Sequence, residues 1–514
     1  MSRVLALAVA ALAALITGCA SLPPIEGRQT TSAIVDTAGT RLGRAVAADV
    51  AAHPGQTAVH AFPEPHDAFA ARVLLAGAAE KSLDVQYYIW NGDQVGYLMF
   101  EALWQAAERG VRVRVLLDDM NTGGLDPTIA ALDAHPNIEV RLYNPMLLRS
   151  ARGLNFVTDF TRVNHRMHNK SFTADNQASV VGGRNIANEY FGAGSGIVFA
   201  DLDVIVIGAA VRDVSKEFDL YWNSPSAYPA ASFVGVPGPE GAANLKVQFA
   251  ATRTDPQSLA YVDAVRARPV IQELLDRKLP FEWTTARLVH DDPAKTLDTT
   301  ARTDVLLFPE LVRTIGRPEK TLDLVSPYFV PGEQGTAALV ALANRGVKVR
   351  ILTNSLSSSD ESAVHAGYAK RRGDLLRAGV QLYELKATAG RESSEGRAKL
   401  GSSSSSGLHA KTFAVDQDRI FVGSFNFDQR SALLNTEMGL VIASPSLAQA
   451  LAQVFDTIVP KAAYEVRLAS DGRSLEWIER TAAGETRYDT EPNTSWFLRS
   501  KVEMLSILPI DWLL

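Results

Sequence analysis

Cysteine is nearly absent from this sequence of 514 residues, which has a single one at position 19. One thiol can form neither a disulfide within the chain nor a cysteine-based metal site, so both are excluded. Runs of like charge are missing as well, because 51 Lys and Arg are interspersed with 57 Asp and Glu and the net charge is −6. Binding of a phosphate backbone depends on clustered cations, so this balance argues against a nucleic-acid partner.

The N-terminus has the pattern of an export signal. Arg3 precedes an apolar stretch over Val4–Ile16, which is shorter than the roughly 20 residues needed to span a bilayer. The stretch ends in Ile16-Thr17-Gly18-Cys19 and resembles a bacterial lipobox, in which the cysteine becomes the acylated first residue. We therefore predict a lipoprotein signal peptide over 1–19 with lipidation at Cys19. The alternative is an ordinary cleaved signal with an incidental cysteine.

The residues after Cys19 bear on where the protein would be held. Ala20 stands where an inner-membrane retention signal would carry Asp. The lipobox resemblance therefore implies export to the periplasmic face of a bacterial membrane, the outer rather than the inner one. Residues 20–57 are rich in Ala, Pro, Gly and Thr, and we interpret them as a flexible tether to the folded part.

Beyond the tether the chain repeats itself. A helix, a glycine stop and an alternating strand occur at 102–117 and recur in the same order at 338–352. The strands at 140–143 and 380–383 also match, and all offsets lie between 236 and 241 residues. With 46% apolar and 21% charged residues, the chain is typical of a core-forming protein that is too long for one domain.

This repeat predicts an α/β fold: two α/β sandwich domains related by pseudo-twofold symmetry, each with helices covering a sheet. Packing of the two halves would bring equivalent loops into one shared cleft. The predicted division is a first domain at 58–244, a connecting region at 245–300, a second domain at 301–460 and a C-terminal extension at 461–514. The extension is apolar and aromatic from Trp496 onward, and it could seat the protein on lipid or cap the core.

One motif occurs twice at the same offset. Five residue types recur 241 residues apart: His168, Lys170, Asp175, Gly182 and Asn185 in the first copy, and His409, Lys411, Asp416, Gly423 and Asn426 in the second. A lone histidine on a strand is usually ordinary packing, but duplication of the whole set favours catalysis. The two histidines are therefore the central candidates.

Each residue type of the motif has a chemical use. An imidazole can attack phosphorus or transfer a proton near neutral pH. Of His168 and His409, one can therefore be the nucleophile while the other transfers the protons. Donors on Lys170, Lys411, Asn185 and Asn426 would surround the phosphoryl oxygens, where charge develops in the transition state. Asp175 and Asp416 complete the candidate catalytic set, although support of a strand or turn, or a cross-domain ion pair, suits them better than chemistry.

The motifs identify the chain as resembling the phospholipase D superfamily and, within it, the bacterial cardiolipin synthases of the C type. The likeness runs from about Ala61 to the end. It includes the segments LDVQYYIW, HRMHNKSFTAD, VGGRNIANEYFGAG, LHAKTF, VGSFNFDQRSALLNTEMG and ILPIDWLL. The resemblance implies two phospholipase D-like domains.

The resemblance also implies a mechanism. His168 would attack the phosphodiester to form a phosphatidyl-histidine, while His409 protonates the leaving alcohol and later deprotonates the acceptor. An acidic residue downstream of each motif would orient a histidine. Glu437 fits this role, and Asp201 fits it in the first half, with Asp203 as the alternative. No metal and no other cofactor is implied.

The implied reaction is phosphatidyl transfer between membrane phospholipids. Phosphatidylglycerol and phosphatidylethanolamine, or two molecules of phosphatidylglycerol, would give cardiolipin. The alternative is a hydrolytic phospholipase D that releases phosphatidic acid. One chain suffices to build the site, and the oligomeric state is left open. A Ser-rich loop at 391–407 ends two residues before His409 and could be a lid or a solvated excursion. His365 is a lesser candidate for substrate contact.

Overall fold

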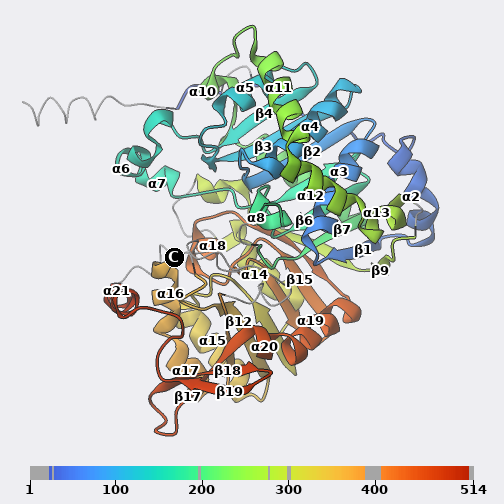
Figure 1. Ribbon diagram of the computed structural model, residues 1–514. Coiled ribbons are helices and arrows are strands. Elements are labelled where there is room, and N and C mark those ends of the chain that lie inside the picture. The colour runs from blue at the N-terminus through green and yellow to red at the C-terminus, as the bar shows by residue number, and fades with distance from the viewer. Residues whose placement is uncertain are drawn as a thin grey trace, which may run out of the picture.

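The structure is a computed structural model that describes residues 22–25, 28–194, 198–275, 278–297, 303–359, 361–387 and 407–508. The predicted signal peptide with Cys19, and the Ser-rich loop up to residue 406, lie outside the described residues. Two α/β bodies are stacked on each other, one coloured blue to green and the other yellow to red in Figure 1. The predicted fold class of two α/β domains is confirmed.

The first domain is built on a nine-stranded mixed sheet with the order β8-β4-β3-β2-β5-β6-β7-β1-β9. The neighbouring strands β2, β3 and β4 run parallel, and the others pair antiparallel. The strands are β1 (Thr57–Phe62), β2 (Ser82–Ile89), β3 (Arg112–Asn121), β4 (Ile138–Tyr143), β5 (Ser171–Ala174), β6 (Ala178–Gly182), β7 (Asp203–Gly208), β8 (Ala227–Pro229) and β9 (Glu282–Thr284).

The second domain repeats this plan in a ten-stranded sheet with the order β10-β16-β15-β14-β11-β12-β13-β17-β18-β19. Here β11, β12 and β13 are the parallel strands. The strands are β10 (Ala286–His290), β11 (Thr321–Val325), β12 (Lys348–Asn354), β13 (Gln381–Leu385), β14 (Thr412–Val415), β15 (Arg419–Gly423), β16 (Met438–Ile442), β17 (Ala463–Leu468), β18 (Leu475–Thr481) and β19 (Gly484–Tyr488).

Helices cover both faces of the two sheets. Those of the first half and the connection are α2 (Arg41–Ala52), α3 (Pro65–Ala78), α4 (Gln94–Glu108), α5 (Asp126–Asp133), η1 (Arg149–Leu154), α6 (Asn155–Thr158), α7 (Phe160–Val163), α8 (Asn188–Phe191), α9 (Ala209–Trp222), α10 (Ala231–Val234), α11 (Gly241–Thr254), α12 (Pro256–Arg266), α13 (Pro269–Leu275) and η2 (Pro293–Thr296). Those of the second half are η3 (Thr303–Val305), α14 (Leu307–Ile315), α15 (Gly332–Asn344), α16 (Ser362–Ala369), α17 (Arg372–Arg377), α18 (Gln429–Leu433), α19 (Pro445–Thr457), α20 (Val459–Ala462) and α21 (Trp496–Ser506).

The predicted helix–glycine–strand repeat is confirmed. Helix α4 leads through Gly110 into β3, and α15 leads through Gly346 into β12. Both glycines have positive φ angles, 90° and 87°, a conformation that any side chain would strain. Equivalent residues therefore end equivalent helices in the two domains.

The two domains share a hydrophobic core. Strands β6 and β7 of the first sheet pack against β15 and β16 of the second. Both faces of these strands are buried, which explains why their sequences are nearly continuous apolar runs. The shared core includes Val181, Val204, Val206, Ile420, Val422, Met438 and Leu440. Burial of apolar area on this scale stabilises one fixed arrangement of the domains.

The structure corrects the interpretation of 20–57 as a flexible tether. From residue 28 onward this segment packs on the first domain. The guanidinium of Arg28 donates to the backbone carbonyls of Asn223, Ser224 and Ala227, and the Thr40 hydroxyl caps helix α2. Composition alone could not reveal these contacts, because Arg28 meets partners almost 200 residues away.

The connecting region is also more than a linker. Helices α11, α12 and α13 pack on α3 and α4 of the first domain, while β9 joins the first sheet and β10 the second. Its prolines do not interrupt this structure, since Pro256 and Pro269 are the first residues of α12 and α13. Proline is favoured there, because the first turn of a helix needs no backbone N–H donor.

The C-terminal extension is divided between two roles. Its strands β17, β18 and β19 extend the second sheet, and helix α21 packs Val502 against Leu356 and Ala366. The same helix leaves Trp496 and Phe497 about three-quarters exposed, at 74% and 73%. Contact with a membrane therefore stays a prediction. Among the described residues, no helix is both long and apolar enough to cross a bilayer.

Candidate active site

The two motif histidines stand at the start of equivalent strands, His168 before β5 and His409 before β14. Each is tied by its backbone to the other half of the chain. The His168 N–H donates to the carbonyl of Thr436, and the His409 N–H donates to the carbonyl of Ala200. These backbone hydrogen bonds between the two halves hold both histidines at the domain boundary, where a shared site was predicted.

The acidic partners are exchanged between the domains. Glu437, directly before β16, has an oxygen 2.8 Å from Nδ1 of His168. Asp201, two residues before β7, has an oxygen 2.7 Å from Nδ1 of His409. A carboxylate that accepts Nδ1–H fixes the tautomer in which Nε2 carries the free lone pair. Each histidine is thus positioned by the opposite half of the chain.

The alternative acid, Asp203, forms ion pairs within the first domain. Its carboxylate is buried and lies 2.9 Å from the guanidinium of Arg72 and 3.5 Å from that of Arg184. These pairs connect helix α3 and the Gly182–Asn185 turn with strand β7. Asp203 therefore stabilises the first domain, and Asp201 is the residue that contacts a histidine.

The two lysines are buried beside the histidines. Lys170 Nζ donates to the carbonyl of His168 at 2.6 Å. Lys411 Nζ makes the equivalent bond to His409 at 2.6 Å and lies 3.0 Å from both nitrogens of that ring. Both ammoniums therefore lie close enough to an imidazole to attract a phosphodiester anion to it.

The paired asparagines are buried with spare hydrogen-bonding capacity. Asn185 Oδ1 accepts from the N–H of Ile89 at 3.1 Å, while its Nδ2 has no partner among the described residues. Oδ1 of Asn426 has none there either. Buried polar atoms in native proteins are normally paired, so the Asn185 amide N–H fits a phosphoryl oxygen, whereas the Asn426 Oδ1 accepts and fits a hydroxyl donor of a ligand.

The structure does not bring Asp175 and Asp416 to the histidines. Each lies at the opposite end of its strand from the histidine, at a positive φ angle. Asp175 accepts the backbone N–H groups of Glu80, Lys81 and Ser82, and Asp416 accepts those of residues 319–321. Both carboxylates hold the entry to the neighbouring parallel strand. Their inclusion in the catalytic set is corrected to a structural role in a turn.

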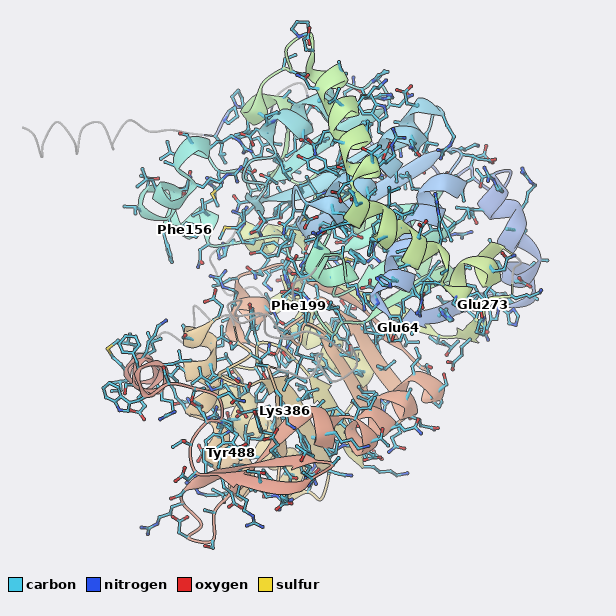
Figure 2. All side chains as sticks on the ribbon, in the orientation of Figure 1. Glu64, Phe156, Phe199, Glu273, Lys386 and Tyr488 are labelled. Atoms are coloured by element: carbon cyan, nitrogen blue, oxygen red, sulfur yellow. The ribbon has the colours of Figure 1, made fainter. Side chains whose placement is uncertain are left out.

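Sequence reasoning missed the aromatic rings around the histidines. The edge of Tyr88 meets His168 at 4.9 Å between ring centroids. Tyr190 and Phe199 enclose His409 at 4.9 and 5.5 Å, and Figure 2 labels Phe199 at the junction of the two domains. These rings restrict the rotation of each imidazole and exclude water. Tyr88 belongs to a segment that carries the family resemblance, but its strand pattern does not show that the ring faces a site.

His365 is not part of this site. It lies on α16 in a buried cluster, where Nε2 is 2.9 Å from Glu491 and the guanidinium of Arg372 also contacts that carboxylate. Contact of His365 with the substrate is therefore corrected to an internal role in the second domain. No group of three or more His, Cys, Asp or Glu side chains in the described ranges has an arrangement that could hold a metal ion.

Burial sets the protonation states of the site. It lowers the pKa of His168 well below 6.5 and, together with Lys411, lowers that of His409 to about 3. Burial also lowers the pKa of Lys170 to about 7 and raises that of Glu437 to about 7. For Asp201 burial acts upward, but its interaction with His409 and the nearby charges of Lys411 and Arg184 outweigh it and lower the pKa to about 2. Both imidazoles are therefore neutral at neutral pH, the form that a nucleophile needs.

Glu437→Gln is expected to move the alkaline limb of kcat/KM to lower pH. As pH rises through about 7, Lys170 loses its proton and attracts a phosphodiester less strongly. The Glu437 carboxylate favours charged Lys170, so an uncharged amide lets that proton leave at lower pH. The pH profile of kcat/KM for each protein measures this shift. An alkaline limb at the same pH in both would contradict the coupling.

The family model described as "Cardiolipin synthase, PLD-like domain" matches the chain twice, at residues 74–222 and 311–459. Cardiolipin synthase C of Escherichia coli (strain K12) is 47% identical over 474 residues, which are 92% of this chain and all of the relative. The major cardiolipin synthase of Bacillus subtilis (strain 168) is 24% identical over 73% of this chain and 64% of its own length.

Among solved structures, phosphatidylserine synthase of Haemophilus influenzae is similar in fold. The TM-score is 0.52 at 14% sequence identity, and the match covers 83% of this chain and 91% of that one. At this identity the likeness concerns the fold alone.

Proposed function

Because the chain belongs to the family of PLD-like cardiolipin synthase domains, we propose that it is a phosphatidyltransferase that makes cardiolipin from membrane phospholipids. The observation that carries the proposal is the pair of histidines, each bonded at Nδ1 to an acid of the opposite domain. Two buried lysines beside them suit a phosphodiester anion.

In the first step His168 is the nucleophile. Its Nε2 attacks phosphorus, and the bond from phosphorus to the headgroup oxygen breaks. His409 gives a proton to that oxygen, so glycerol or ethanolamine leaves as a neutral alcohol. The ionised Asp201 carboxylate and the bound phosphodiester anion both favour protonated His409 in the complex. Lys170, Lys411, Asn185 and Asn426 hold the phosphoryl oxygens.

In the second step a hydroxyl of the phosphatidylglycerol headgroup attacks the phosphatidyl-histidine. His409, now neutral, takes the hydroxyl proton, and the bond between phosphorus and His168 breaks. The products are cardiolipin and free His168. Formation of cardiolipin requires that water be kept from the phosphatidyl-histidine, since water as the acceptor would release phosphatidic acid instead. Tyr88, Tyr190 and Phe199 pack where they would limit that access.

The test is to identify the products by mass spectrometry. Purified protein is incubated with phosphatidylglycerol, with and without phosphatidylethanolamine. We expect cardiolipin, with ethanolamine released when the second lipid is the donor and glycerol when phosphatidylglycerol reacts with itself. Phosphatidic acid as the sole product in both incubations would overturn the proposal and favour the hydrolytic alternative.

We also propose that the protein is held by a lipid on Cys19 at the periplasmic face of the outer membrane. The support is the only cysteine of the chain at the end of a signal-like stretch, followed by Ala20. The exposed aromatic pair Trp496 and Phe497 would add a second, weaker contact with lipid.

Cys19→Ser is therefore expected to remove the anchor. The variant should take up no labelled palmitate and should leave the outer-membrane fraction, because one thioether-linked lipid supplies most of the membrane affinity. Ser21→Ala serves as the matched control and should behave like the parent. Equal labelling and equal fractionation of the Cys19 variant would contradict the anchor.

A further inference from the structure

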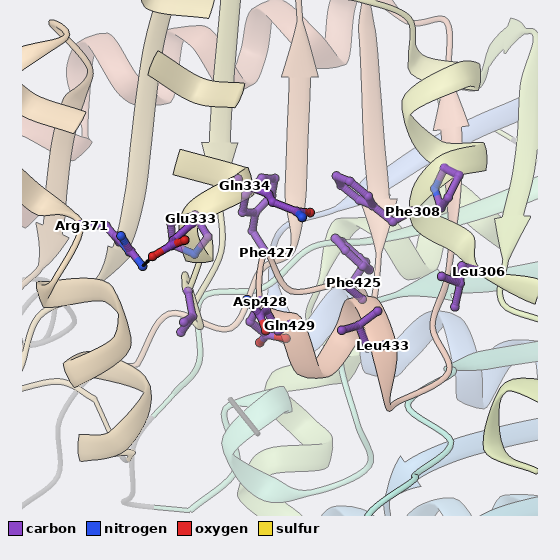
Figure 3. Close-up of a pocket in the computed structure, with 15 residues that line it drawn as sticks. Leu306, Phe308, Glu333, Gln334, Arg371, Phe425, Phe427, Asp428, Gln429 and Leu433 are labelled. Carbon is purple, nitrogen blue, oxygen red and sulfur yellow. Dashed lines mark hydrogen bonds and ion pairs between the residues drawn. The ribbon is translucent and has the colours of Figure 1, made fainter. Parts of the chain in front are cut away.

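Two adjoining cavities lie in the second domain, between helices α14 and α15. The proximal cavity, of about 560 Å³, is next to the second motif and includes Phe308, Gln334, Phe425, Phe427 and Leu433, which Figure 3 shows around it. The distal cavity, of about 470 Å³, continues along α15 toward Arg345. Phe308 and Phe427 line both cavities, so together they form one groove.

The groove is polar at one end and apolar along the rest. Gln429 and Asp428 border the proximal cavity. The wall of the distal cavity is formed by aliphatic and aromatic side chains, including Leu311, Ile315, Leu339, Leu342 and Phe413, with the exposed heads of Arg317 and Arg345 at its rim. An open hollow of this size with an apolar wall fits an apolar ligand.

The equivalent helices of the first domain, α3 and α4, are covered by other helices, so that domain serves as an internal reference. There α3 and α4 pack directly against each other, and α11 and α12 lie across them, as the green helices over the blue ones in Figure 1 show. Phe69 of α3 is covered by Tyr261 of α12. No described helix lies across α14 and α15 in this way, and the equivalent ring of Phe308 faces the groove.

The wall of the groove on α15 has two alanines between two long polar side chains. Gln334, Ala338, Ala341 and Arg345 recur every three or four positions and line the two cavities in that order. The alanines leave the space open, and a glycine, Gly335, lies under the ring of Phe427. In the first domain the residue at the position of Gly335, 236 residues earlier, is the buried Met99.

The proximal cavity is lined by residues next to Asn426 in the sequence, while the histidines, lysines and asparagines of the two motifs do not line it. Phe425 and Phe427 flank Asn426, one of the proposed phosphate-binding residues. Asp428 caps helix α18 at Ser431, whose hydroxyl donates to Glu437, the partner of His168. A ligand with a polar phosphate near Asn426 and an apolar tail would therefore match the polarity of the groove from its proximal to its distal end.

We infer that this groove holds one acyl chain of the phospholipid substrate. The inference rests on the proposed function, because a chain can be bound there only if the phosphate at the histidines belongs to a lipid. The bound chain orients the donor or acceptor lipid relative to His168 and His409. The extent of the groove along α15 determines which acyl chain lengths fit.

The test uses Ala338→Trp, with Ala337→Trp as matched control. Both alanines are exposed on α15, but only Ala338 lines the groove. For dioleoyl phosphatidylglycerol, Ala338→Trp should raise KM at least about tenfold, the equivalent of about two methylene groups that are no longer buried. For dihexanoyl phosphatidylglycerol, KM should stay within about twofold of the control.

A second variant tests the direction of the chain. Ala341→Trp narrows the groove one turn further from the motif. The shortest acyl chain whose KM it raises should therefore be longer than the shortest chain whose KM Ala338→Trp raises. Equal kinetics of Ala338→Trp and Ala337→Trp with the dioleoyl lipid would overturn the inference, as would an equal penalty for the dihexanoyl lipid.

Binding separates this inference from the proposed function. A phosphatidylglycerol with one pyrene-labelled decanoyl chain is titrated into each protein, and pyrene fluorescence reports where the tail lies. We expect saturable binding to the parent and to Ala337→Trp, and at least about tenfold weaker binding to Ala338→Trp. If the parent makes phosphatidic acid alone but these affinities still differ, the proposed function fails and the groove stands. If cardiolipin forms and the affinities are equal, the groove fails alone.

Discussion

Replacing His168 by alanine is expected to lower kcat by at least about 10⁴-fold, and adding His409→Ala should cost little more. The two imidazoles act in one reaction sequence, so either loss stops the same turnover and the effects are far from additive. The measurement is cardiolipin formation by the two single variants and the double variant. Thermal unfolding of each protein checks that the domains remain folded.

The matched control for these variants is His60→Ala. His60 is a β1 histidine whose Nδ1 bonds to the carbonyl of Pro280 rather than to an acid, and its loss should leave kcat within about twofold. Effects of His168→Ala and His409→Ala that multiply in the double variant would mean that the two residues do not share one reaction. That result would contradict a common active centre.

Asp201→Asn should lower kcat by about 10²- to 10⁴-fold while leaving most of the fold intact. The amide keeps the shape of the carboxyl but removes the charge that favours protonated His409, and its NH₂ group donates to Nδ1 where an acceptor is needed. The variant therefore lacks a protonated His409 to donate a proton to the leaving alcohol. The kcat of the variant, compared with its melting temperature, measures this effect.

Asp203→Asn provides the opposite pattern. Asp203 is as deeply buried as Asp201, but it pairs with Arg72 and Arg184. Breaking that pair should reduce the free energy of unfolding by about 3 kcal/mol or more, with little change in the kcat of the folded protein. If both aspartate variants lose stability alone, or both lose activity alone, the division between them is wrong.

The crossed pairing explains why both halves are needed. Glu437 is 269 residues from His168, and Asp201 is 208 residues from His409. Separation of the domains would leave each imidazole without its carboxylate and each buried carboxylate without its donor, which is costly for a buried charge. The shared apolar core of β6, β7, β15 and β16 therefore also preserves the catalytic geometry.

Local patterns predicted the repeat and the motif well, because helix ends at Gly110 and Gly346 and the spacing from His168 to Asn185 are local features. The exchange of acids could not be predicted in the same way. Family resemblance indicates that Glu437 and Asp201 orient a histidine, but which histidine each meets depends on how two sheets pack. That packing is a long-range property with no signature in either motif.

The errors have physical causes as well. The region at 245–300 was predicted to be only a connection, yet it packs as helices in which Pro256 and Pro269 occupy the first turn, where proline is favoured. The strand pattern around Tyr88 could not show that its ring meets His168, because a residue near the end of a strand can face either the core or a site. Composition could not show that Arg28 is fixed by three backbone carbonyls.

The most direct test of the central claim is to trap the covalent intermediate. Protein is mixed with phosphatidylglycerol, quenched by denaturation within one turnover and digested, and the peptide that contains His168 is analysed by mass spectrometry. We predict a phosphatidyl adduct on His168, absent from His168→Ala and present at a different level in His409→Ala. Turnover to cardiolipin in the parent with no adduct on His168 would contradict this account.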